Sequence, residues 1–495
     1  MPKENLKKLK SGTDVRGVAV GDNAPVTLTD EAVTKISKAF YKWLTLKTGK
    51  TNLKIALGND SRISAPRICG LVKQAILSSG GDVVYTGLSS TPSMFILLQK
   101  RTGLDASIMI TASHMPYDRN GLKFFTPEGG LDGKDIDEVL ELAESGEFVS
   151  GSGEYGESPF MDEYSAILVD KVVKECGKLP LKGKKIIVDA GNGAGGFFAE
   201  KVLKPLGADI SGSQFLEPDG RFPNHIPNPE DKEAIDSLSR AVIKNKADFG
   251  IIFDTDVDRA ACVNADGEEI NRNSLIALIS GILLEEKPGT IVTDSVTSDA
   301  LTEFIESRGG KHLRYMRGYR NVIDKCKELN ESGVYSPLAI ETSGHAAFKE
   351  NYYLDDGAYL IVKLLISLAK KDLTSVISDL KRPAEECEVR LGFNKNSTDF
   401  KKEGAKVIED LKALAEKSEN MRLAPDNYEG VKIGLESGTF ILRMSVHDPV
   451  MPINFESNFT GGNNKTKAEL LKILNGYAFL DTQNLKNSIT IKGEK

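Results

Sequence analysis

Three carboxylates at alternate positions lie in DTDVDR, residues 254–259, which directly follows an apolar run. If the chain turns after that run, Asp254, Asp256 and Asp258 surround a small cation, and such an all-oxygen site suits Mg²⁺. The alternatives are a solvated acidic turn and the beginning of a calcium loop. An EF-hand calcium loop needs glycine at its sixth position, where this segment has Arg259. We therefore predict a divalent metal site, with Arg259 either a counter-ion or a ligand of a metal-bound phosphate.

A candidate nucleophile lies in TASHMPYDRNGLKFF, residues 111–125, directly after a second apolar run. Ser113 stands near the end of that run, beside His114 and ten residues before Lys123. A serine activated by a neighbouring base acts as a nucleophile; the alternative is that Ser113 only caps the next helix or turn. The pair Asn120-Gly121 predicts a turn that brings Lys123 back over Ser113.

A third polar cluster is ETSGH, residues 341–345, after the apolar run LAI. Glu341 and Ser343 offer an acceptor and a donor suited to sugar hydroxyls, and His345 is a candidate acid or base. The alternatives are a glutamate paired with a lysine, a serine in a turn and a histidine bonded within the packing.

Three arginines are candidate anion ligands. Arg16 lies among turn-forming residues in SGTDVRG, and Arg317 and Arg320 lie in MRGYRN. A guanidinium group binds phosphate through two parallel hydrogen bonds. The alternative is that these three side chains are solvated on the surface.

Short β-branched runs precede these clusters, as expected of strands in βα units. In open α/β sheets, ligands bind beyond the carboxyl ends of the strands, which is where the polar clusters would then fall. The predicted buried parallel strands contain Ile108-Met109-Ile110, Ile186-Ile187-Val188, Ile251-Ile252-Phe253, Ile291-Val292 and Leu338-Ala339-Ile340.

The length of 495 residues predicts three or four domains. Domain edges are expected in the Gly- and Ser-rich segment 145–158, after a hairpin turn in VNADGEEINR, and near Lys381-Arg382-Pro383. After Pro383, residues 401–419 have the spacing of an amphipathic helix, and 431–446 resemble two strands joined at Ser437-Gly438. The last hundred residues therefore predict a separate α+β domain.

Charge and cysteine content exclude several classes of protein. The net charge of −7 lacks the basic excess of a nucleic-acid binder, and the five cysteines form no CxxC pair. The first residues lack the apolar core of a signal peptide, and no apolar run reaches the length of a membrane span. We predict a cytoplasmic protein with no nucleic-acid or membrane partner.

The order and spacing of the clusters resemble the α-D-phosphohexomutases, the phosphoglucomutase and phosphomannomutase family, over nearly the whole chain. SGTDVRG is similar to the family's opening motif, TASHMP with NGLK to its phosphoserine loop, DTDVDR to its metal loop and ETSGH to its sugar-specificity loop. Further similar stretches are GNDSR (58–62), DAGNGAG (189–195) and EPDGRFPNHIPNPE (217–230).

The resemblance implies three related α/β domains with mixed sheets plus a C-terminal α+β domain, arranged around a central cleft. Combined with the edges above, it predicts an α/β domain with the phosphoserine loop at 1–160 and one with the metal loop at 161–272. An α/β domain with the sugar-binding loop follows at 273–385, and the α+β domain with a phosphate-binding loop occupies 386–495.

The resemblance also assigns roles to the site residues. Ser113 is the phosphorylated residue, and together with Asp254, Asp256 and Asp258 it binds Mg²⁺. Lys123 and His345 are the candidate proton-transfer groups, with Arg16, His114 and Arg259 also catalytic. The substrate ligands implied by the resemblance or proposed from residue type are Glu341, Ser343, Arg317, Arg320, Arg443, Ser445 and His447.

The implied enzyme is an isomerase of carbohydrate metabolism that interconverts a hexose 1-phosphate and its 6-phosphate. Phosphoserine donates its phosphoryl group, a bisphosphorylated sugar reorients, and the other phosphate returns to Ser113. Mg²⁺ and a hexose 1,6-bisphosphate activator are the expected cofactors, a small sugar phosphate the partner, and a monomer or homodimer the assembly. Because 341–345 resembles the glucose/mannose subgroup, glucose and mannose phosphates are the predicted substrates, with phosphoglucosamine mutase as the nearest alternative.

The C-terminal phosphate loop departs from the family pattern Arg-Pro-Ser-Gly-Thr-Glu-Pro, because residues 443–449 are RMSVHDP. The missing Gly-Thr would supply backbone N–H groups and a hydroxyl to a phosphate. Met115, Thr255 and Val257 also replace usual family residues. Two alternatives therefore stay open: a non-catalytic sugar-phosphate-binding regulatory homologue and a metal-dependent phosphatase.

Overall fold

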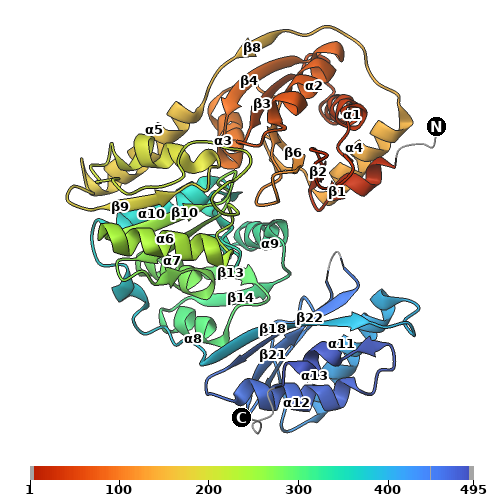
Figure 1. Cartoon of the computed structure of the whole chain (residues 1–495), viewed down its shortest axis with the longest axis vertical. Coiled ribbons are helices and arrows are strands. Elements are labelled where there is room, and N and C mark those ends of the chain that lie inside the picture. The colour runs from red at the N-terminus through yellow and green to blue at the C-terminus, as the bar shows by residue number, and fades with distance from the viewer. Residues whose placement is uncertain (1–4, 446–447, 490–495) are drawn as a thin grey trace. The chain divides into compact units, whose positions relative to one another are not determined.

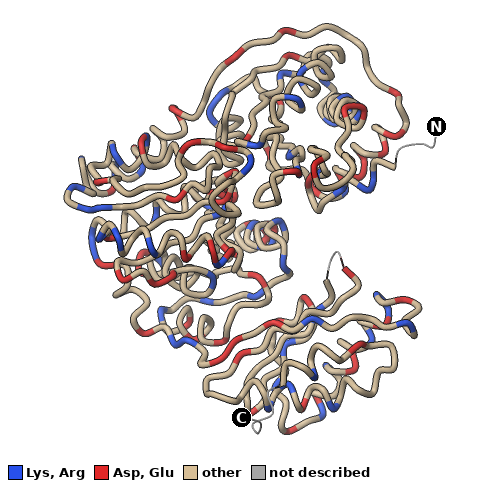
Figure 2. Tube along the Cα trace, viewed as in Figure 1, with Lys and Arg blue, Asp and Glu red and all other residues tan. Residues whose placement is uncertain are grey.

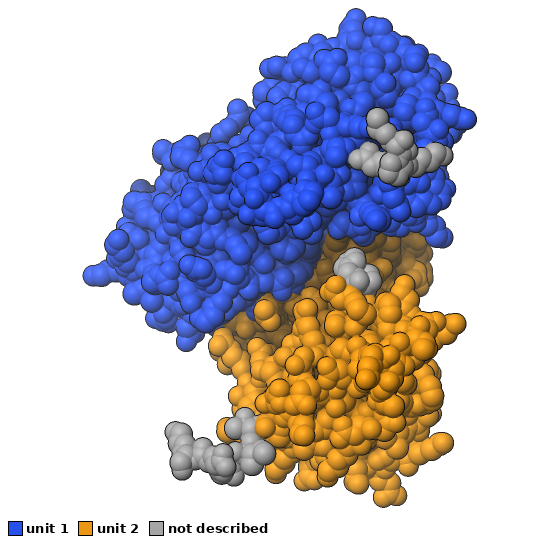
Figure 3. Space-filling model, turned by 45° about the vertical axis from the view of Figure 1, so that its right-hand side comes forward, with its two compact units in different colours: residues 1–271, 343–375 blue, residues 272–342, 376–495 orange. Residues whose placement is uncertain are grey.

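The computed structural model describes residues 5–445 and 448–489, and its chain forms two compact units. Unit 1 comprises residues 1–271 and 343–375, and unit 2 comprises residues 272–342 and 376–495 (Figure 3). The site residue His447 therefore lies outside the described residues. Acidic and basic side chains are interspersed along the trace of each unit (Figure 2). Among the described residues, no helix is both long and apolar enough to cross a membrane.

Unit 1 begins with a mixed sheet in the order β1-β2-β6-β5-β3-β4-β8, with β7 paired to β6. Strand β5 is buried along its whole length, between parallel β3 and antiparallel β6. The strands are β1 (Lys10–Ser11), β2 (Asp14–Val18), β3 (Lys54–Asn59), β4 (Asp82–Leu88), β5 (Ala106–Ile110), β6 (Arg119–Thr126), β7 (Gly129–Gly130) and β8 (Tyr155–Glu157).

Helices cover both faces of this sheet, because side chains alternate between the faces along each strand. Ile108 and Ile110 of β5 join the core formed with α1, where Phe40 stacks on Phe124 at 4.4 Å between ring centroids. Ser107, on the opposite face, donates its hydroxyl to Met94 O of α3. The helices are α1 (Asp30–Thr48), α2 (Ala65–Ser78), α3 (Thr91–Lys100) and α4 (Gly133–Ser145) (Figure 1).

The rest of unit 1 contains a four-stranded mixed sheet in the order β12-β11-β10-β9. Strands β9 and β10 are parallel, whereas β10 and β11 are antiparallel and joined by the DTDVDR segment. Helix α10 packs against α5. The elements are α5 (Met161–Cys176), β9 (Ile186–Asp189), a π-helix (Phe198–Leu203), α6 (Lys232–Asn245), β10 (Phe249–Phe253), β11 (Ala260–Asn264), β12 (Glu269–Ile270), β16 (Ala346–Phe348), β17 (Leu354–Asp355) and α10 (Gly357–Leu368).

Unit 2 contains parallel strands followed by an antiparallel sheet. Strand β13 (Thr290–Asp294) pairs in parallel with β14 (Lys311–Tyr315) and β15 (Leu338–Ile340). The accompanying helices are α7 (Arg272–Glu286), α8 (Asp299–Ser307) and α9 (Tyr319–Glu331).

The second part of unit 2 is an antiparallel sheet in the order β19-β20-β21-β22-β18-β23. Helices α11 and α12 share one core with this sheet, so they cover the same face (Figure 1). The elements are β18 (Glu385–Phe393), α11 (Phe400–Lys417), β19 (Arg422–Leu423), β20 (Val431–Leu435), β21 (Gly438–Leu442), β22 (Val450–Ser457), α12 (Gly462–Leu474), β23 (Leu480–Asp481) and α13 (Gln483–Asn487).

The predicted fold class, related α/β domains followed by an α+β domain, is confirmed. The five strands expected before the polar clusters are also present. One local prediction is wrong: Asn120 and Gly121 do not form a turn but lie inside β6. The turn occurs earlier, in the loop 111–118, because Gly121 pairs with Arg16 across the sheet. The predicted linker 145–158 is largely exposed but contains β8, which extends the sheet beside β4.

The close approach of strands at Gly121 generates a first prediction. A Cβ at this position would lie 2.3 Å from Val15 O and 2.8 Å from Thr111 O, both rigid backbone atoms. We expect Gly121→Ala to lower the melting temperature of the protein, because overpacking lowers the free energy of unfolding by about 1–3 kcal/mol. The matched control is Gly156→Ala in β8, where a Cβ meets nothing within 4 Å. Equal melting temperatures for the two variants, measured by scanning calorimetry, would contradict the steric argument.

Candidate active site

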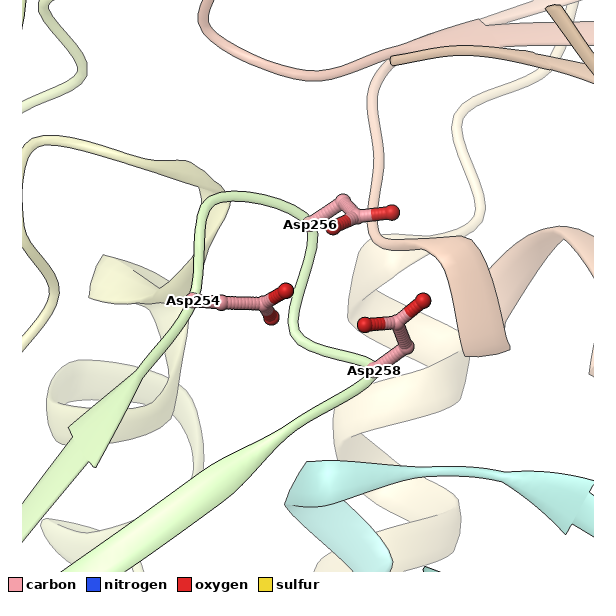
Figure 4. A group of neighbouring side chains, drawn as sticks. All are labelled: Asp254, Asp256 and Asp258. Carbon is pink, nitrogen blue, oxygen red and sulfur yellow. The ribbon is translucent and has the colours of Figure 1, made fainter. Parts of the chain in front are cut away.

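The three aspartates of the β10–β11 connection converge on one point in unit 1. Candidate ligand atoms of Asp254, Asp256 and Asp258 all lie within 4.8 Å of one another, and the three residues are buried (Figure 4). The loop folds this way because β10 ends at Phe253 and β11 returns antiparallel from Ala260, with Val257 at φ 68° between them. The structure therefore brings together the residues predicted to bind a divalent metal.

Burial and mutual repulsion dominate the electrostatics of these carboxylates. Burial raises the pKa of Asp254 well above its usual value, and the charges of Asp258 and Asp256 raise it further. Burial also raises the pKa of Asp256, with Asp258 adding to the effect. For Asp258, burial is outweighed chiefly by the charge of Lys123, with Arg259 contributing, so its pKa is lowered. Three buried carboxylates so close together need more positive charge nearby than Lys123 and Arg259 provide.

The hydrogen bonds of the triad leave oxygens free for a metal. Among the described residues, Asp256 Oδ1 and Asp258 Oδ1 are buried and accept no hydrogen bond. The other oxygen of each carboxylate is engaged, Asp256 Oδ2 by the Thr91 hydroxyl and Asp258 Oδ2 by Lys123 Nζ at 2.8 Å. Buried carboxylate oxygens without a proton donor fit a hard divalent cation.

The Ser113 hydroxyl lies directly beside this triad. Ser113 Oγ donates to Asp254 Oδ2 at 3.1 Å and accepts from Arg259 Nη2 at 2.7 Å. The residue is 3% exposed and adopts φ 52°, a conformation that costs a non-glycine residue about 1–3 kcal/mol. The alternative that Ser113 caps a helix is excluded, because the loop 111–118 leads into strand β6.

Arg259 connects the serine to the metal loop. Its guanidinium is buried, and Nε donates to Asp254 Oδ2 at 3.1 Å. The same guanidinium donates to His114 Nδ1. Burial lowers the pKa of His114 to about 3, and the charges of Arg259 and Arg16 contribute. His114 is therefore neutral near pH 7 and accepts a hydrogen bond rather than carrying charge.

Lys123 and His345 border the same carboxylates. Lys123 projects from β6, opposite Met109 of β5, and His345 Nε2 lies 3.7 Å from Asp258 Oδ1. Burial lowers the pKa of His345 well below its usual value, and the charges of Arg259 and Lys123 lower it further. Ser343 Oγ lies 2.9 Å from His345 Nδ1, which orients the ring.

Arg16 lies on β2 and pairs with Asp14 through Nη2 at 2.6 Å. Its charge is one of those that lower the pKa of His114. Unit 1 thus gathers nine predicted residues in one electrostatic neighbourhood: Arg16, Ser113, His114, Lys123, Asp254, Asp256, Asp258, Arg259 and His345.

Unit 2 contains a second polar cluster, organised by the buried Asp294 at the end of β13. Asp294 Oδ2 accepts from Thr342 Oγ1 at 2.7 Å and lies 3.5 Å from Arg317 Nε. Glu341 Oε1 accepts from Gly318 N at 2.7 Å. The segments of Arg317 and Glu341 are therefore tied together by hydrogen bonds within unit 2.

Arg443 adds a second guanidinium to this cluster. Burial lowers the pKa of Arg443, and the charge of Arg317 lowers it further, so the two guanidiniums repel. Arg443 Nε is buried without a hydrogen-bond partner among the described residues, and Arg443 Nη2 lies 3.8 Å from Glu388 Oε2. Two neighbouring guanidiniums, one of them with a buried Nε that makes no hydrogen bond among the described residues, form a candidate anion site.

Two further residues predicted as substrate ligands, Ser445 and Arg320, have partners within the protein. Ser445 N donates to Val450 O at 3.0 Å, and Ser445 Oγ accepts from Asp448 N. Arg320 lies on α9 and pairs with Asp324 at 2.9 Å, one helical turn away.

Comparison with known proteins decides the family. Models of phosphoglucomutase/phosphomannomutase α/β/α domains I, II and III match residues 7–150, 162–267 and 271–383. The chain belongs to the α-D-phosphohexomutase family. It is 31% identical over 451 residues to a phosphoglucomutase of Neisseria gonorrhoeae, covering 90% of this chain and 92% of that protein.

Other relatives agree with this membership. A phosphomannomutase/phosphoglucomutase of Pseudomonas aeruginosa is 29% identical over 449 residues, covering 90% of each chain. A crystal structure of a phosphoglucomutase/phosphomannomutase family protein from Burkholderia thailandensis has a TM-score of 0.81 and 27% identity, covering 99% of both chains. As a phosphohexomutase family member, the chain is an isomerase of the mutase type.

Two supporting residues of this phosphohexomutase were missed in the sequence. Thr91 binds Asp256 twice, through its hydroxyl and through its backbone N–H to Asp256 O at 2.8 Å. Its only sequence signal is the Ser90-Thr91-Pro92 start of α3, which predicts a helix and not a contact with residue 256. Asp294 did carry a signal, because it is the first charged residue after the predicted strand Ile291-Val292.

The free oxygens of the triad generate a second prediction. We expect Asp256→Asn to weaken divalent cation binding by about tenfold or more, because the site loses one anionic ligand. Isothermal titration with Mg²⁺ and electron paramagnetic resonance with Mn²⁺ measure this binding directly. Asp266→Asn, in the exposed turn after β11, is the matched control and should bind as wild type does. Equal affinities in both variants would mean that the triad is only a cluster of buried acids.

Proposed function

We propose that the protein interconverts hexose 1-phosphates and hexose 6-phosphates of glucose, mannose or both, through phospho-Ser113 and a bisphosphorylated sugar. The observation that carries the proposal is the buried Ser113 hydroxyl, hydrogen-bonded between Asp254 and Arg259 beside a carboxylate triad. The names of the relatives, phosphoglucomutase and phosphomannomutase/phosphoglucomutase, support the same reaction.

In the first half-reaction, a hydroxyl oxygen of the sugar phosphate attacks the phosphorus of phospho-Ser113. The bond from phosphorus to Ser113 Oγ breaks, a new phosphate ester forms, and the hydroxyl proton passes to a neighbouring base. The bisphosphate then reorients, and Ser113 Oγ attacks its other phosphate, which regenerates phosphoserine and releases the isomer. Such transfer depends mainly on alignment and on stabilising the charge of the phosphoryl oxygens.

The residues around Ser113 suit this chemistry. Arg259 already donates to Ser113 Oγ, so its guanidinium can bind the oxygens of a phosphoryl group held there. The ammonium group of Lys123, paired with Asp258, adds positive charge on another side. His345 and Lys123 are the candidate groups for the proton transfers.

A divalent cation fits the triad, and Mg²⁺ is the ion that we propose there. It would be held by Asp254, Asp256, Asp258 and a phosphoserine oxygen, and when bound it neutralises charge on the phosphoryl group. The protein's own contribution is to keep Asp256 Oδ1 and Asp258 Oδ1 free of proton donors.

The non-reacting phosphate of the substrate is assigned to the altered loop 443–449. Arg443 has a free buried Nε and lies close enough to Arg317 for the two charges to repel, so an anion would relieve both conditions. Glu341 and Ser343 are the proposed contacts of the sugar hydroxyls, and they favour glucose or mannose phosphates.

The first experiment is a ³¹P NMR time course with Mg²⁺, a trace of glucose 1,6-bisphosphate, and glucose, mannose or glucosamine 1-phosphate in separate tubes. A 6-phosphate resonance in the glucose or mannose tube is the expected result. Appearance of inorganic phosphate instead would identify a phosphatase. No change in any tube, with protein that carries phosphate by intact mass, would favour the non-catalytic alternative.

The position of Ser113 generates a third prediction. Ser113→Ala removes the phosphoryl acceptor, so turnover should fall below detection and the intact mass should show no added phosphate after incubation with bisphosphate. Ser145→Ala, at an exposed site at the end of α4, is the control and should retain both properties. Full turnover by Ser113→Ala would remove this serine from the mechanism.

The buried Nε of Arg443, which has no hydrogen-bond partner among the described residues, generates a fourth prediction. Arg443→Met should raise KM for sugar phosphate by about 10- to 100-fold, because a charge-assisted hydrogen bond to the phosphate is lost. Arg390→Met is the matched control, since Arg390 is exposed on β18 and pairs with Glu388 at 2.8 Å. Unchanged kinetics in both variants would leave Arg443 without a role in binding substrate.

A further inference from the structure

A buried arginine outside the metal and sugar loops holds the loop that carries Ser113. Arg62 belongs to the GNDSR segment, which begins at the end of β3, and its side chain is 0% exposed. It is among the largest fully buried side chains of the described chain. A cation without any contact with water must have each of its donors satisfied by protein.

All five N–H donors of the Arg62 guanidinium have acceptors. Nε donates to Asp60 Oδ2 at 3.2 Å. The other four donate to backbone carbonyls of the Ser113 loop and of the first residue of β6: Nη1 to Pro116 O at 2.6 Å and Arg119 O at 2.9 Å, and Nη2 to Ser113 O and to Met115 O at 2.6 Å. One side chain therefore binds the loop at its beginning, its middle and its end.

These contacts act on Ser113 itself. The backbone of Ser113 has φ 52°, and it is held on one side by Ser113 N donating to Thr111 Oγ1 at 2.9 Å. Arg62 holds the other side through Ser113 O. This backbone conformation fixes where Cβ of Ser113 lies, and so which positions the hydroxyl can reach from its staggered rotamers. The conformation that directs Oγ to Asp254 and Arg259 thus depends on a carbonyl bound by Arg62.

The surroundings of Arg62 keep the guanidinium in place. Asp60 accepts from both Nε and the backbone N–H of Arg62, and burial raises the pKa of Asp60 to about 6. The ring of Phe222 lies 5.2 Å from the Arg62 guanidinium carbon, a distance suited to cation–π contact. Phe222 comes from the segment 217–230, which also forms a backbone bridge between Gly220 and Arg62.

Only arginine satisfies this arrangement. The guanidinium presents five donors in a rigid planar fork, whereas lysine has three donors on a flexible stem. A lysine at position 62 would keep the charge but could make at most three of these five hydrogen bonds. The Ser113 loop would then be free to leave the conformation that directs Oγ to the triad.

We propose that Arg62 is a positioning residue for phosphoryl transfer, which holds the loop 113–119 so that Ser113 Oγ faces Asp254 and Arg259. This inference rests on the proposed function for its kinetic consequence. The proposal requires no contact between Arg62 and the substrate. Arg62 therefore acts on the rate of the transfer step and not on substrate affinity.

The test compares Arg62→Lys with Arg67→Lys. Arg67, in α2 of the same domain, also donates to two backbone carbonyls, Ala19 O and Leu28 O, but not to the Ser113 loop. Arg62→Lys should lower kcat by about 100-fold or more with KM within about threefold of wild type, because misplacement of a reacting group affects the transfer step. Arg67→Lys should leave both constants unchanged.

Amide hydrogen exchange provides a readout that does not depend on turnover. Peptides covering residues 112–119 should exchange faster in Arg62→Lys than in wild type or Arg67→Lys, with the rest of unit 1 unchanged. If wild type shows no mutase turnover, the proposed function fails, and the exchange comparison still decides whether Arg62 holds the loop.

Two results would overturn the proposal. One is a wild-type kcat and wild-type exchange of 112–119 in folded Arg62→Lys. The other is a rise in KM with kcat unchanged, which would make Arg62 a binding residue. If Arg62→Lys does not fold, Asp60→Asn takes its place, because it weakens the anchoring of the guanidinium. It should show a smaller loss of kcat and faster exchange of the same peptides, and wild-type values in both measurements would equally overturn the proposal.

Discussion

The concentration of negative charge in a buried place is the constraint on which the site in unit 1 depends. Three carboxylates with ligand atoms within 4.8 Å of one another repel strongly without water. Arg259 and Lys123 offset part of this charge, and they do so from fixed positions on the metal loop and on β6. The oxygens that these cations leave unbound are the ones that a divalent metal would take.

The same constraint explains the character of the groups nearby. Cations crowded around the carboxylates keep His114 and His345 neutral, because burial and positive neighbours oppose a further positive charge. A neutral imidazole at position 114 can accept from Arg259, which fixes the guanidinium against Ser113. The same few side chains therefore balance the buried charge and position the Ser113 hydroxyl.

Unit 2 shows the opposite imbalance. Arg317 and Arg443 lie close enough to repel, and the buried Asp294 is shared between Arg317 and Thr342. Two guanidiniums that repel one another suit a phosphate, as a surplus of carboxylate oxygens in unit 1 suits a metal.

The sequence by itself determined the features that depend on local pattern. Apolar β-branched runs identified strands such as β5 and β10, and the residues after them, Ser113 and Asp254, Asp256 and Asp258, were predicted as chemical groups. Polar residues that follow the carboxyl end of a buried strand are placed at the edge of its sheet, so residue type and position along the strand predict the groups but not that β5 and β10, from two different sheets, bring theirs together. Only the tertiary structure decided what depends on distant contacts. Asn120-Gly121 became part of a strand because β2 pairs with it, Thr91 met Asp256 across 165 positions of sequence, and Arg62 reached four carbonyls of a loop more than 50 residues away. Backbone carbonyls carry no residue-specific signal, so the sequence could not show which side chain would bind them.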